Sequence, residues 1–440
     1  MDLEKVKQKA VQKFYPEEKE LESAHKVFED ISDFIEQEYG LESHFAGSAG
    51  RGTSRQGDKD IDVFVLFPKD TSRQELEEKG LEIGKKVFGE FSGEHHVEYA
   101  EHPYTKGELS GHEVEIVPCY DTEPEHIQSA VDRSPHHTKW VKDNLDKQQR
   151  KDVVVLKAFL EAQNLYGSSL KIRGFSGYLC ELLIAYYGSF EELIRSAKKW
   201  PQSQRIDFNG SERAFDSEFV VVDPVDPERN VAAVLSKANY AEFIFSAWKF
   251  ENNPSIEFFK KKEEFNEFEL KQELKQRGDL IVLEFSRPEK VDDILYPQLR
   301  KLEALLRKKL ESSDFRVYDS GVHADDKCRI FFEMERHLPD IRIVKGPKVF
   351  HNEEHLEQFS SKYQNVFVDD QRLCAKVERE FTDAQKLLQS FLDGGPSDLR
   401  ERGVPVDISS EIVEHSFTDA LSGDEKWLKY LYRKFNCESK

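Results

Sequence analysis

One short stretch, residues 47–67 (GSAGRGTSRQGDKDIDVFVLF), constrains the fold more than any other part of the chain. It begins with glycines among small and charged residues and ends in an apolar run typical of a buried strand. Since side chains alternate between the faces of a strand, Asp60 and Asp62 share one face, with α-carbons about 6.6 Å apart. Ile61 and Val63 share the other face and are expected in the core. The stretch predicts a glycine turn that leads into a buried strand with two carboxylates at its start.

Two carboxylates at the start of a buried strand need an explanation, because a buried charge is costly unless it is paired or binds a metal. Mg²⁺ prefers hard oxygen ligands and is commonly held by carboxylates together with substrate phosphates. Two metals about 4 Å apart can clamp the attacking and leaving oxygens of a displacement reaction. A glycine turn before a strand with two capping aspartates is the alternative, and the order of the two motifs favours the metal site.

The turn GSAGRG supplies groups that suit a phosphate. Glycines at 47, 50 and 52 allow backbone amides to approach an anion closely. Ser48 can donate its hydroxyl, and Arg51 can pair with phosphate oxygens. The turn and the two aspartates together therefore predict a site for a metal-bound phosphate compound.

A third carboxylate is expected on a neighbouring strand, in GHEVEIVPCY. Glu113 and Glu115 share one face of this strand, and Val114 and Ile116 share the other. Pro118 is expected to end the strand. Either glutamate meets the physical requirement for a ligand, and two solvent-facing glutamates on an edge strand remain the alternative.

The 440 residues predict about three domains. Residues 1–144 combine amphipathic helices with a mixed sheet, in which residues 96–102 and 113–117 are expected as strands joined by the turn TKGELSG. From about residue 147 to 250 the pattern is helical. From residue 254, strands such as GDLIVLEFS alternate with long charged helices, which predicts a two-layer α/β domain. DGGPSD near residue 394 marks a linker.

The composition adds three expectations. The formal net charge of −21 fits an acidic protein that avoids nucleic acid, or one adapted to high salt, and both interpretations stay open. Five scattered cysteines without a Cys-x-x-Cys pair favour reduced thiols in a cytoplasm. The charged N-terminus does not resemble a signal peptide. The longest apolar run, residues 178–187, is interrupted by Glu181 and is too short to span a bilayer.

These residues resemble a known family. The turn Gly47-Ser48 and the Asp60-x-Asp62 pair are similar to the signature shared by DNA polymerase β, poly(A) polymerases and CCA-adding enzymes. The segments IDVFVLFP, VEIVPCY, KIRGFSGYLCELLIAYYGSF and FVVVDPVDPERNVAA, in this order, resemble the archaeal-type (class I) CCA-adding enzymes, which are tRNA nucleotidyltransferases. The resemblance covers about residues 43–300 and fades beyond residue 390.

The resemblance implies an α+β, multidomain fold. A polymerase-β-like nucleotidyltransferase palm forms the head (1–145), a helical domain forms the neck (146–255), and an α/β (RRM-like) body with a C-terminal tail (256–440) holds the tRNA. It also implies template-independent addition and repair of the 3′-terminal CCA with CTP and ATP, release of pyrophosphate, and a two-metal mechanism with Mg²⁺. The expected partner is the tRNA acceptor end, the expected location is cytoplasmic, and a homodimer is one alternative for the oligomeric state.

The resemblance also assigns residues. Asp60, Asp62 and Glu115 fall on the family's metal ligands, and Ser48 and Arg51 fall on its triphosphate contacts. His137, Lys157 and Tyr166 fall on further nucleotide contacts, and Arg229 falls on the arginine that selects the base. The resemblance thereby chooses Glu115 over Glu113. Departures from the family pattern are Asp at 60 and Glu at 115, where the acid types are more often exchanged, Gly50 in the turn, and Thr138 in HHTKW.

Each assigned residue also has an ordinary structural interpretation. Lys157 and His137 suit solvated surface positions, Tyr166 suits a ring packed with its hydroxyl in water, and Arg229 suits a surface charge near a helix start. The basic segment at residues 195–205, with Trp200 as a stacking face, is a candidate for contact with RNA or plain solvated surface. Two other functions share the motifs: a poly(A)- or oligoadenylate-type transferase, and a catalytically silent RNA-binding protein.

Overall fold

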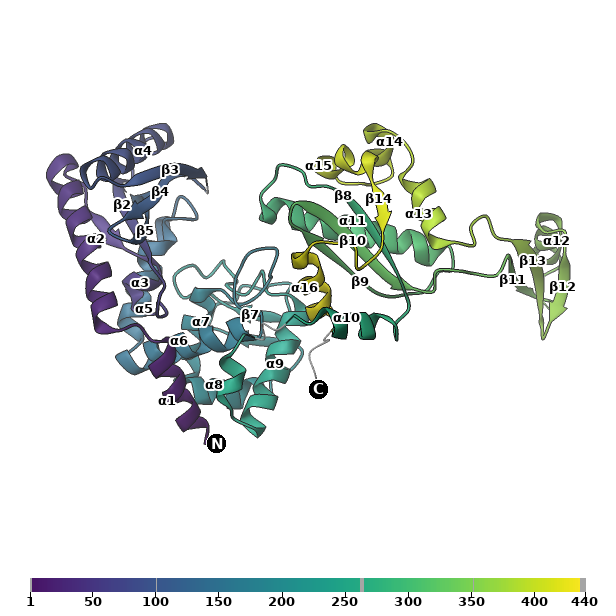
Figure 1. Cartoon of the computed structure of the whole chain (residues 1–440), viewed down its shortest axis with the longest axis horizontal. Helices are drawn as coiled ribbons and strands as arrows, with labels where there is room; N and C mark the ends of the chain where they lie inside the picture. Colours follow the sequence, from purple (N-terminus) through teal and green to yellow (C-terminus); the bar gives the residue numbers. More distant parts are fainter. Residues whose placement is uncertain (1, 100, 262–264, 351, 436–440) are drawn as a thin grey trace. The chain divides into compact units, whose positions relative to one another are not determined.

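The computed structural model describes residues 2–99, 101–261, 265–350 and 352–435. The chain divides into two compact units, Met1–Lys262 and Glu263–Lys440 (Figure 1). Each unit has its own hydrophobic core. None of the helices in the described ranges is long and apolar enough to cross a membrane.

The first unit begins with a five-stranded mixed sheet of order β1-β2-β5-β4-β3. Its strands are Ser43–Phe45 (β1), Asp60–Pro68 (β2), Glu94–Tyr99 (β3), Pro103–Leu109 (β4) and His112–Asp121 (β5). Strands β2 and β5 run parallel, and the other pairs are antiparallel. The expected alternation of β2 is confirmed, because Ile61 and Val63 lie in the core beneath α2 (Glu18–Tyr39) and α4 (Arg73–Glu90). The two aspartates are thereby directed to the face opposite these helices.

The hairpin beside β5 differs from the expectation. The segment TKGELSG was expected as a turn, but most of it is β4, and the turn is reduced to Ser110 and Gly111, both with positive φ. Gly107 belongs to the strand because a Cβ there would fall 2.1 Å from the carbonyl oxygen of Glu94. The glycine that suggested a turn therefore permits the close approach of two strands.

The prediction that Pro118 ends β5 is wrong, because the strand continues to Asp121. Pro118 lies opposite Val65 of β2. Pairing of β5 with β4 stops at Ile116, so beyond this residue β5 has a neighbouring strand on one side only. A proline is tolerated there because one edge of the strand needs no backbone donor.

The rest of the first unit is mainly helical. Its helices are α1 (Leu3–Phe14), α3 (Gly47–Arg51), α5 (Arg133–Asn144), α6 (Lys147–Ala162), α7 (Gly177–Tyr187), α8 (Phe190–Ala197) and α9 (Lys237–Asn252). A small parallel sheet of β6 (Gln204–Ile206) and β7 (Phe219–Val221) joins them. Helices α1 and α6 to α9 share one core, which includes Val6, Phe159, Leu183 and Phe250.

The second unit is built on an antiparallel sheet of order β14-β8-β10-β9. Its strands are Asp279–Ser286 (β8), Val317–Ala324 (β9), Lys327–Met334 (β10) and Ser416–Thr418 (β14). The long helix α11 (Asp292–Ser312), with α13 (Ala384–Leu392), α14 (Pro396–Glu401) and α15 (Val406–Ser409), packs on one side. The expected two layers become three, because α10 (Glu267–Leu274) and α16 (Glu425–Lys434) cover the other face through Val282, Phe331 and Trp427.

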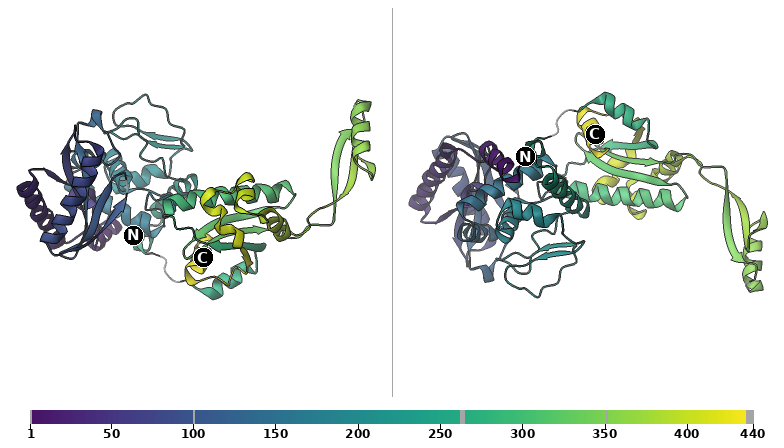
Figure 2. Two further views of the ribbon diagram at one scale, coloured as in Figure 1. Left: turned by 90° about the horizontal axis from the view of Figure 1, so that it is seen from above. Right: turned by 90° about the horizontal axis from the view of Figure 1, so that it is seen from below.

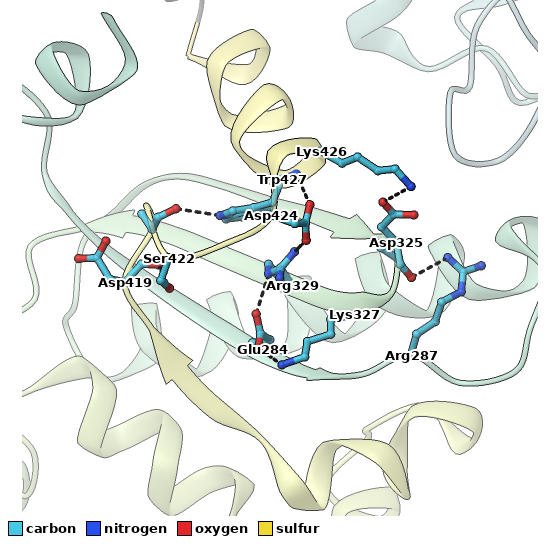
Figure 3. Close-up of polar contacts among 12 residues, drawn as sticks. Glu284, Arg287, Asp325, Lys327, Arg329, Asp419, Ser422, Asp424, Lys426 and Trp427 are labelled. Atoms are coloured by element: carbon cyan, nitrogen blue, oxygen red, sulfur yellow. Dashed lines mark hydrogen bonds and ion pairs between the residues drawn. The ribbon is translucent and has the colours of Figure 1, made fainter. Parts of the chain in front are cut away.

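Helix α16 is joined to the sheet by a chain of ion pairs (Figure 3). Arg329 of β10 donates to Glu284 of β8 at 2.7 Å and to Asp424, the N-cap of α16, at 2.6 Å. Lys327 donates to the other oxygen of Glu284 at 2.5 Å. The indole N–H of Trp427 donates to the carbonyl of Ala420. The third layer is therefore fixed by paired charges as well as by apolar contact.

A smaller three-stranded sheet lies between β10 and α13 in the sequence. It has the order β11-β13-β12, from Ile341–Lys348 (β11), Val366–Asp369 (β12) and Arg372–Glu378 (β13). Helix α12 (Glu353–Lys362) lies along it in both views of Figure 2, and Phe359 packs where Gly346 lacks a side chain. In β13, Cys374 and Ala375 are the buried residues.

Four cysteines, Cys119, Cys180, Cys328 and Cys374, are free and buried. Cys437 lies outside the described residues. Burial raises the pKa of the Cys180 thiol to about 12, so this thiol is inert at neutral pH.

Candidate nucleotidyl-transfer site

The glycine turn is fitted tightly against β2. Gly47 has a φ of +62°, and a Cβ at this position would fall 1.6 Å from Oδ2 of Asp62. The backbone N–H of Ala46 donates to the carbonyl of Asp62 at 3.0 Å. Gly50, the unusual residue of the turn, is explained by a Cβ position only 2.2 Å from the carbonyl oxygen of Phe45. Both glycines are required because the turn packs directly against the start of the strand.

The acidic residues of β2 and β5 lie side by side. Asp60 is in register with Glu113, and Asp62 with Glu115. Burial, and then the charge of Glu115, raises the pKa of Asp62 to about 6. Burial and the charge of Glu113 raise the pKa of Asp60 in the same direction. The register therefore concentrates negative charge that a cation would relieve.

One cation already lies beside these carboxylates. Lys106 of β4 contacts Glu113 at 2.6 Å and Glu115 at 2.8 Å. Although burial lowers it, the hydrogen bonds to these two glutamates raise the pKa of Lys106 overall. Lys106 was not among the residues assigned from the sequence. It neutralises Glu115 and leaves Asp62 as the carboxylate of the pair without such a contact.

The residues present fit a hard divalent cation by chemistry and register. Asp62 and Glu115 offer carboxylate oxygens from adjacent parallel strands, and burial together with the charge of Glu115 raises the pKa of Asp62, a cost that such a cation would offset. The side chains themselves do not close a cluster, because within the described ranges no three His, Cys, Asp or Glu side chains are grouped to hold a metal ion. Lys106 meets Glu115 through one of its two carboxylate oxygens, Oε1.

A second group of charges lies beside the turn and is buried. Arg51 donates from Nε to Oε1 of Glu181 at 2.9 Å, and Thr53 donates to the same oxygen at 2.5 Å. Nζ of Lys157 donates to the carbonyl of Thr53 at 2.8 Å and lies 4.0 Å from Glu181. Lys157 is 1% exposed, so it is not the solvated lysine of the alternative interpretation. Burial lowers the pKa of Lys157.

Tyr166 lies next to this group. A Cβ at Gly177 would be 3.3 Å from the hydroxyl of Tyr166 and 3.6 Å from Nζ of Lys157, so both side chains reach the start of α7. Arg55 lies over the ring of Tyr166, 5.4 Å from its centroid. Burial raises the pKa of the Tyr166 hydroxyl, which therefore stays protonated at neutral pH. The tyrosine is a neutral donor beside two cations.

The third group is centred on Asp223, which is fully buried. It accepts from Arg229 at 2.8 Å and from the hydroxyl of Tyr178 at 3.1 Å, and it contacts Nε2 of His137 at 2.9 Å. The rings of His137 and Tyr178 stack with centroids 3.9 Å apart. Although burial raises it, the contacts with His137 and Arg229 lower the pKa of Asp223 to about 2. His137 is buried, which excludes the plain surface interpretation.

The three groups share the field of Arg51. Its charge lowers the pKa of Asp62 and that of His137. The structure therefore brings the sequence-predicted residues into one region of the first unit. Ser48 lies in it between Gly47 and Arg51, although its hydroxyl makes none of the hydrogen bonds found among the described residues. The backbone carbonyl of Ser48 accepts from the N–H of Thr53, which closes the turn.

Two acidic residues of this region, Glu181 and Asp223, were not assigned from the sequence. Each is a single acid in an apolar run, YLCELLIAYY and FVVVDP, and this is the signal that could have identified them. Trp200, offered as a stacking face for RNA, is instead buried, stacks on Phe219 and Tyr240, and donates to the hydroxyl of Tyr187. Its aromatic face serves the core.

Family models match three segments of the chain. Residues 28–137 match the nucleotidyltransferase domain, residues 151–260 match the second domain of tRNA nucleotidyltransferase, and residues 277–398 match the C-terminal domain of the CCA-adding enzyme. The first two matches contain every residue assigned to the site.

Curated relatives match along most of the chain. The CCA-adding enzyme of Methanocaldococcus jannaschii is 39% identical over 415 residues, which cover 90% of this chain and 92% of that one. The CCA-adding enzyme of Archaeoglobus fulgidus is 38% identical over 399 residues, with 89% and 90% covered. That of Methanothermobacter thermautotrophicus is 36% identical over 395 residues, with 86% and 87% covered.

Proposed function

Because the chain belongs to the family of CCA-adding enzymes, we propose that it adds and repairs the 3′-terminal CCA of tRNA with CTP and ATP. Pyrophosphate is released, and the order of bases is set without a nucleic-acid template. One observation carries the proposal for this chain: Asp62 and Glu115 lie in register beside a turn whose Arg51 binds Glu181 of α7, the helix whose Tyr178 donates to Asp223 in the group around His137 and Arg229. Binding of a nucleoside triphosphate is proposed to use the carboxylates, the cations beside the turn and the group around Asp223 together.

The carboxylates Asp60, Asp62 and Glu115 would hold Mg²⁺. When bound, this ion supplies charge neutralisation at the triphosphate and favours the ionised form of the RNA 3′-hydroxyl. The protein's own part is positioning and electrostatics. The turn at Gly47 places the carboxylate of Asp62 beside the first residues of α3, where Ser48 and Arg51 are proposed to contact the phosphates.

Lys157 and Tyr166 are proposed to complete the contacts with the phosphates and sugar. Both reach the start of α7 at Gly177, where the absent side chain allows their polar ends to lie close to the helix. Lys157 is a buried ammonium, so its attraction for a phosphate is stronger than that of a surface lysine. Transfer then consists of attack by the 3′-oxygen on the α-phosphorus and departure of pyrophosphate.

Arg229 is proposed to select the base. Its side chain is 38% exposed and its guanidinium is held by Asp223 through one terminal nitrogen, which leaves other N–H donors for a base edge. His137 shares the same carboxylate and is proposed to contact the nucleotide as a neutral imidazole, because burial lowers its pKa. CTP and ATP would be selected by the N–H donors of Arg229, which Asp223 holds in a fixed direction, and by the RNA.

The wider assignments are proposed on the same basis. The head (1–145), neck (146–255) and body with tail (256–440) would divide the work between nucleotide transfer and binding of the tRNA acceptor end. A homodimer is proposed as an alternative to a monomer. The free cysteines among the described residues support a reducing, cytoplasmic setting.

The test uses tRNA that lacks CCA, ends in C, or ends in CC. Each is incubated with Mg²⁺ and CTP, ATP or both, and the products are sized at nucleotide resolution. Stepwise addition of C, C and A followed by a stop supports the proposal. Unlimited addition of A would move the protein to the poly(A)-type transferases, and binding of tRNA without any addition would leave an RNA-binding protein.

A further inference from the structure

We propose that Glu181 is the positioning residue of the triphosphate site, which holds Arg51 and Lys157 in the orientation that receives the nucleotide. The inference rests on the proposed triphosphate role of these two cations. Glu181 lies on α7, Arg51 at the end of α3 and Lys157 on α6, so one carboxylate joins three elements of the first unit.

The burial of Glu181 makes its charge strong. Its side chain is 0% exposed, whereas that of Arg51 is 12% exposed, so the carboxylate lies beneath the arginine as seen from solvent. A buried carboxylate is costly unless cations compensate it. Arg51 at 2.9 Å and Lys157 at 4.0 Å are the two cations that face it within the described ranges.

The geometry of Arg51 fits a supporting contact rather than a closed ion pair. A structural arginine–carboxylate pair commonly uses two parallel N–H bonds. Here Arg51 donates only from Nε, and its terminal nitrogens make none of the hydrogen bonds found among the described residues. An arginine held by Nε presents its remaining donors in a fixed direction, as a phosphate clamp requires.

The carboxylate also has unused capacity. Oε1 of Glu181 accepts from Arg51 and Thr53, whereas Oε2 has no hydrogen-bond partner in the part of the chain that the structure describes. A buried oxygen of this kind lowers the stability of the unliganded protein. Stability is commonly given up at sites that must accept a charged ligand. Lys157 beside it is hydrogen-bonded to Thr53 but lies 4.0 Å from Glu181, so the two charges are not in direct hydrogen-bond contact.

Glu181 also maintains the charge of Lys157. Burial lowers the pKa of this lysine, and the largest opposing influence is the charge of Glu181. Without the carboxylate, the protonated fraction of Lys157 that is ready to bind the triphosphate would be smaller. Removal of Glu181 therefore weakens two phosphate contacts, even though it also removes a negative charge from the neighbourhood.

The test compares Glu181→Gln with wild-type protein and with Glu191→Gln as the matched control. Glu191 is another buried carboxylate of the first unit, and it contacts Lys7 at 2.5 Å. Binding of CTP, ATP and inorganic tripolyphosphate, each with Mg²⁺, is measured by calorimetry on the full chain. We expect Glu181→Gln to weaken all three by the same factor of about ten, the effect of one charge-assisted hydrogen bond. Glu191→Gln should bind all three as wild type does.

Kinetics separate positioning from general loss of structure. KM for the nucleotide should rise by the same factor, with kcat within about twofold, because binding rather than chemistry is affected. In combination with Arg51→Lys, the loss should be smaller than the product of the two single losses. Unchanged affinity for tripolyphosphate in Glu181→Gln, or a loss that depends on the base, would overturn the proposal.

A second variant keeps the test decisive if Glu181→Gln does not fold. Thr53→Val removes the hydroxyl that donates to Glu181 and leaves the charges in place. A smaller loss, again common to the three ligands, is expected, and no loss would overturn the proposal. Tripolyphosphate binding needs no tRNA, so this result stands apart from the proposed function. Absence of CCA addition by the wild type would refute that function and leave the role of Glu181 decided by binding.

Discussion

Two buried ion networks, the one around Glu284 in the second unit and the one around Glu181 in the first, differ in how completely they are satisfied. In the second unit, Lys327 and Arg329 supply one donor to each oxygen of Glu284, and Arg329 also reaches Asp424 (Figure 3). Although burial raises it, hydrogen bonds from Lys327 and Arg329 lower the pKa of Glu284. The charged forms are stabilised, as expected of a network that holds a helix on a sheet.

In the first unit, the network around Glu181 remains incomplete. One of its oxygens has no partner among the described residues, and Lys157 has a pKa lowered by burial. The nearby carboxylate of Asp62 has a raised pKa. The two networks therefore differ in their capacity for a further partner, because Glu181 keeps an oxygen without a partner among the described residues, whereas both oxygens of Glu284 are occupied. The predictions below test this difference.

The largest effect is expected for Asp62→Asn. The change removes the carboxylate that the turn at Gly47 surrounds, so nucleotide addition should fall by about 100-fold or more. At the same time, the free energy of unfolding at pH 7 should rise by up to about 2 to 3 kcal/mol, because a charge with a pKa raised to about 6 destabilises the folded state. Primer-extension assays and thermal melts without metal measure both. A variant that is inactive and also less stable would contradict this account.

The pH dependence of that stability difference has a definite sign. The folded-state pKa of Asp62 is raised from 3.8 to about 6, so its neutral form is favoured and stability is lost as pH rises through 6. The advantage of Asp62→Asn should therefore be small below about pH 4, grow between pH 4 and 6, and stay level above that range. Urea unfolding of both proteins from pH 3.5 to 8, without divalent metal, measures it. A difference that is constant over this range would exclude Asp62 as its source.

Arg329→Met tests the satisfied network. The substitution leaves Glu284 paired with Lys327, and it leaves Asp424, which is already partly exposed, without its arginine. The unfolding free energy should therefore fall by about 2 kcal/mol, which is less than the loss expected for a fully buried pair. Affinity for CTP and tripolyphosphate should not change, because these charges serve the packing of α16. A change in nucleotide affinity without loss of stability would remove the distinction between the networks.

How much of the fold could be predicted from the sequence depends on how far apart in the sequence the interacting residues lie. The alternation of Asp60 and Asp62 with Ile61 and Val63 is local, and the structure has it as expected. The continuation of β5 through Pro118 could not be predicted, because tolerance of the proline depends on where β4 stops pairing. That information is present only in the assembled sheet.

The site divides in the same way. Family resemblance supplied the cations and the carboxylates, since these have motifs. It did not supply Glu181 or Asp223, because each acts through a partner far away in sequence. Lys106 lies only 9 residues from Glu115, but it was missed because its segment was expected as a turn and not as β4. Glu181 is 130 residues from Arg51, and Asp223 is 86 residues from His137. A buried acid in an apolar run indicates that a partner exists, but the sequence does not say which cation it meets.

Asp223→Asn tests selection of the base. The amide keeps the shape but weakens the contacts with Arg229 and His137, so Arg229 should lose its fixed direction. Discrimination of CTP and ATP against UTP and GTP should fall by about tenfold, while binding of tripolyphosphate stays unchanged. Misincorporation on tRNA ending in C or CC measures this. A loss common to all nucleotides would place Asp223 with Glu181 instead.

The smallest effect is expected for Lys106→Met, which removes the cation that occupies the carboxylates of β5. In the wild type, Lys106 lies 2.8 Å from Oε1 of Glu115 and competes with a metal for this carboxylate. Without Lys106 this competition disappears, and binding of Mn²⁺ as a spectroscopic probe should tighten by about three- to tenfold, the effect of one partly exposed ion pair. If the affinity for Mn²⁺ falls instead, Lys106 supports the metal ligands rather than competing for them. The incomplete network of the first unit would then include Lys106 of β4. The direction of this change therefore decides whether the acidic pair of Asp62 and Glu115 is held apart or held together in the unliganded protein.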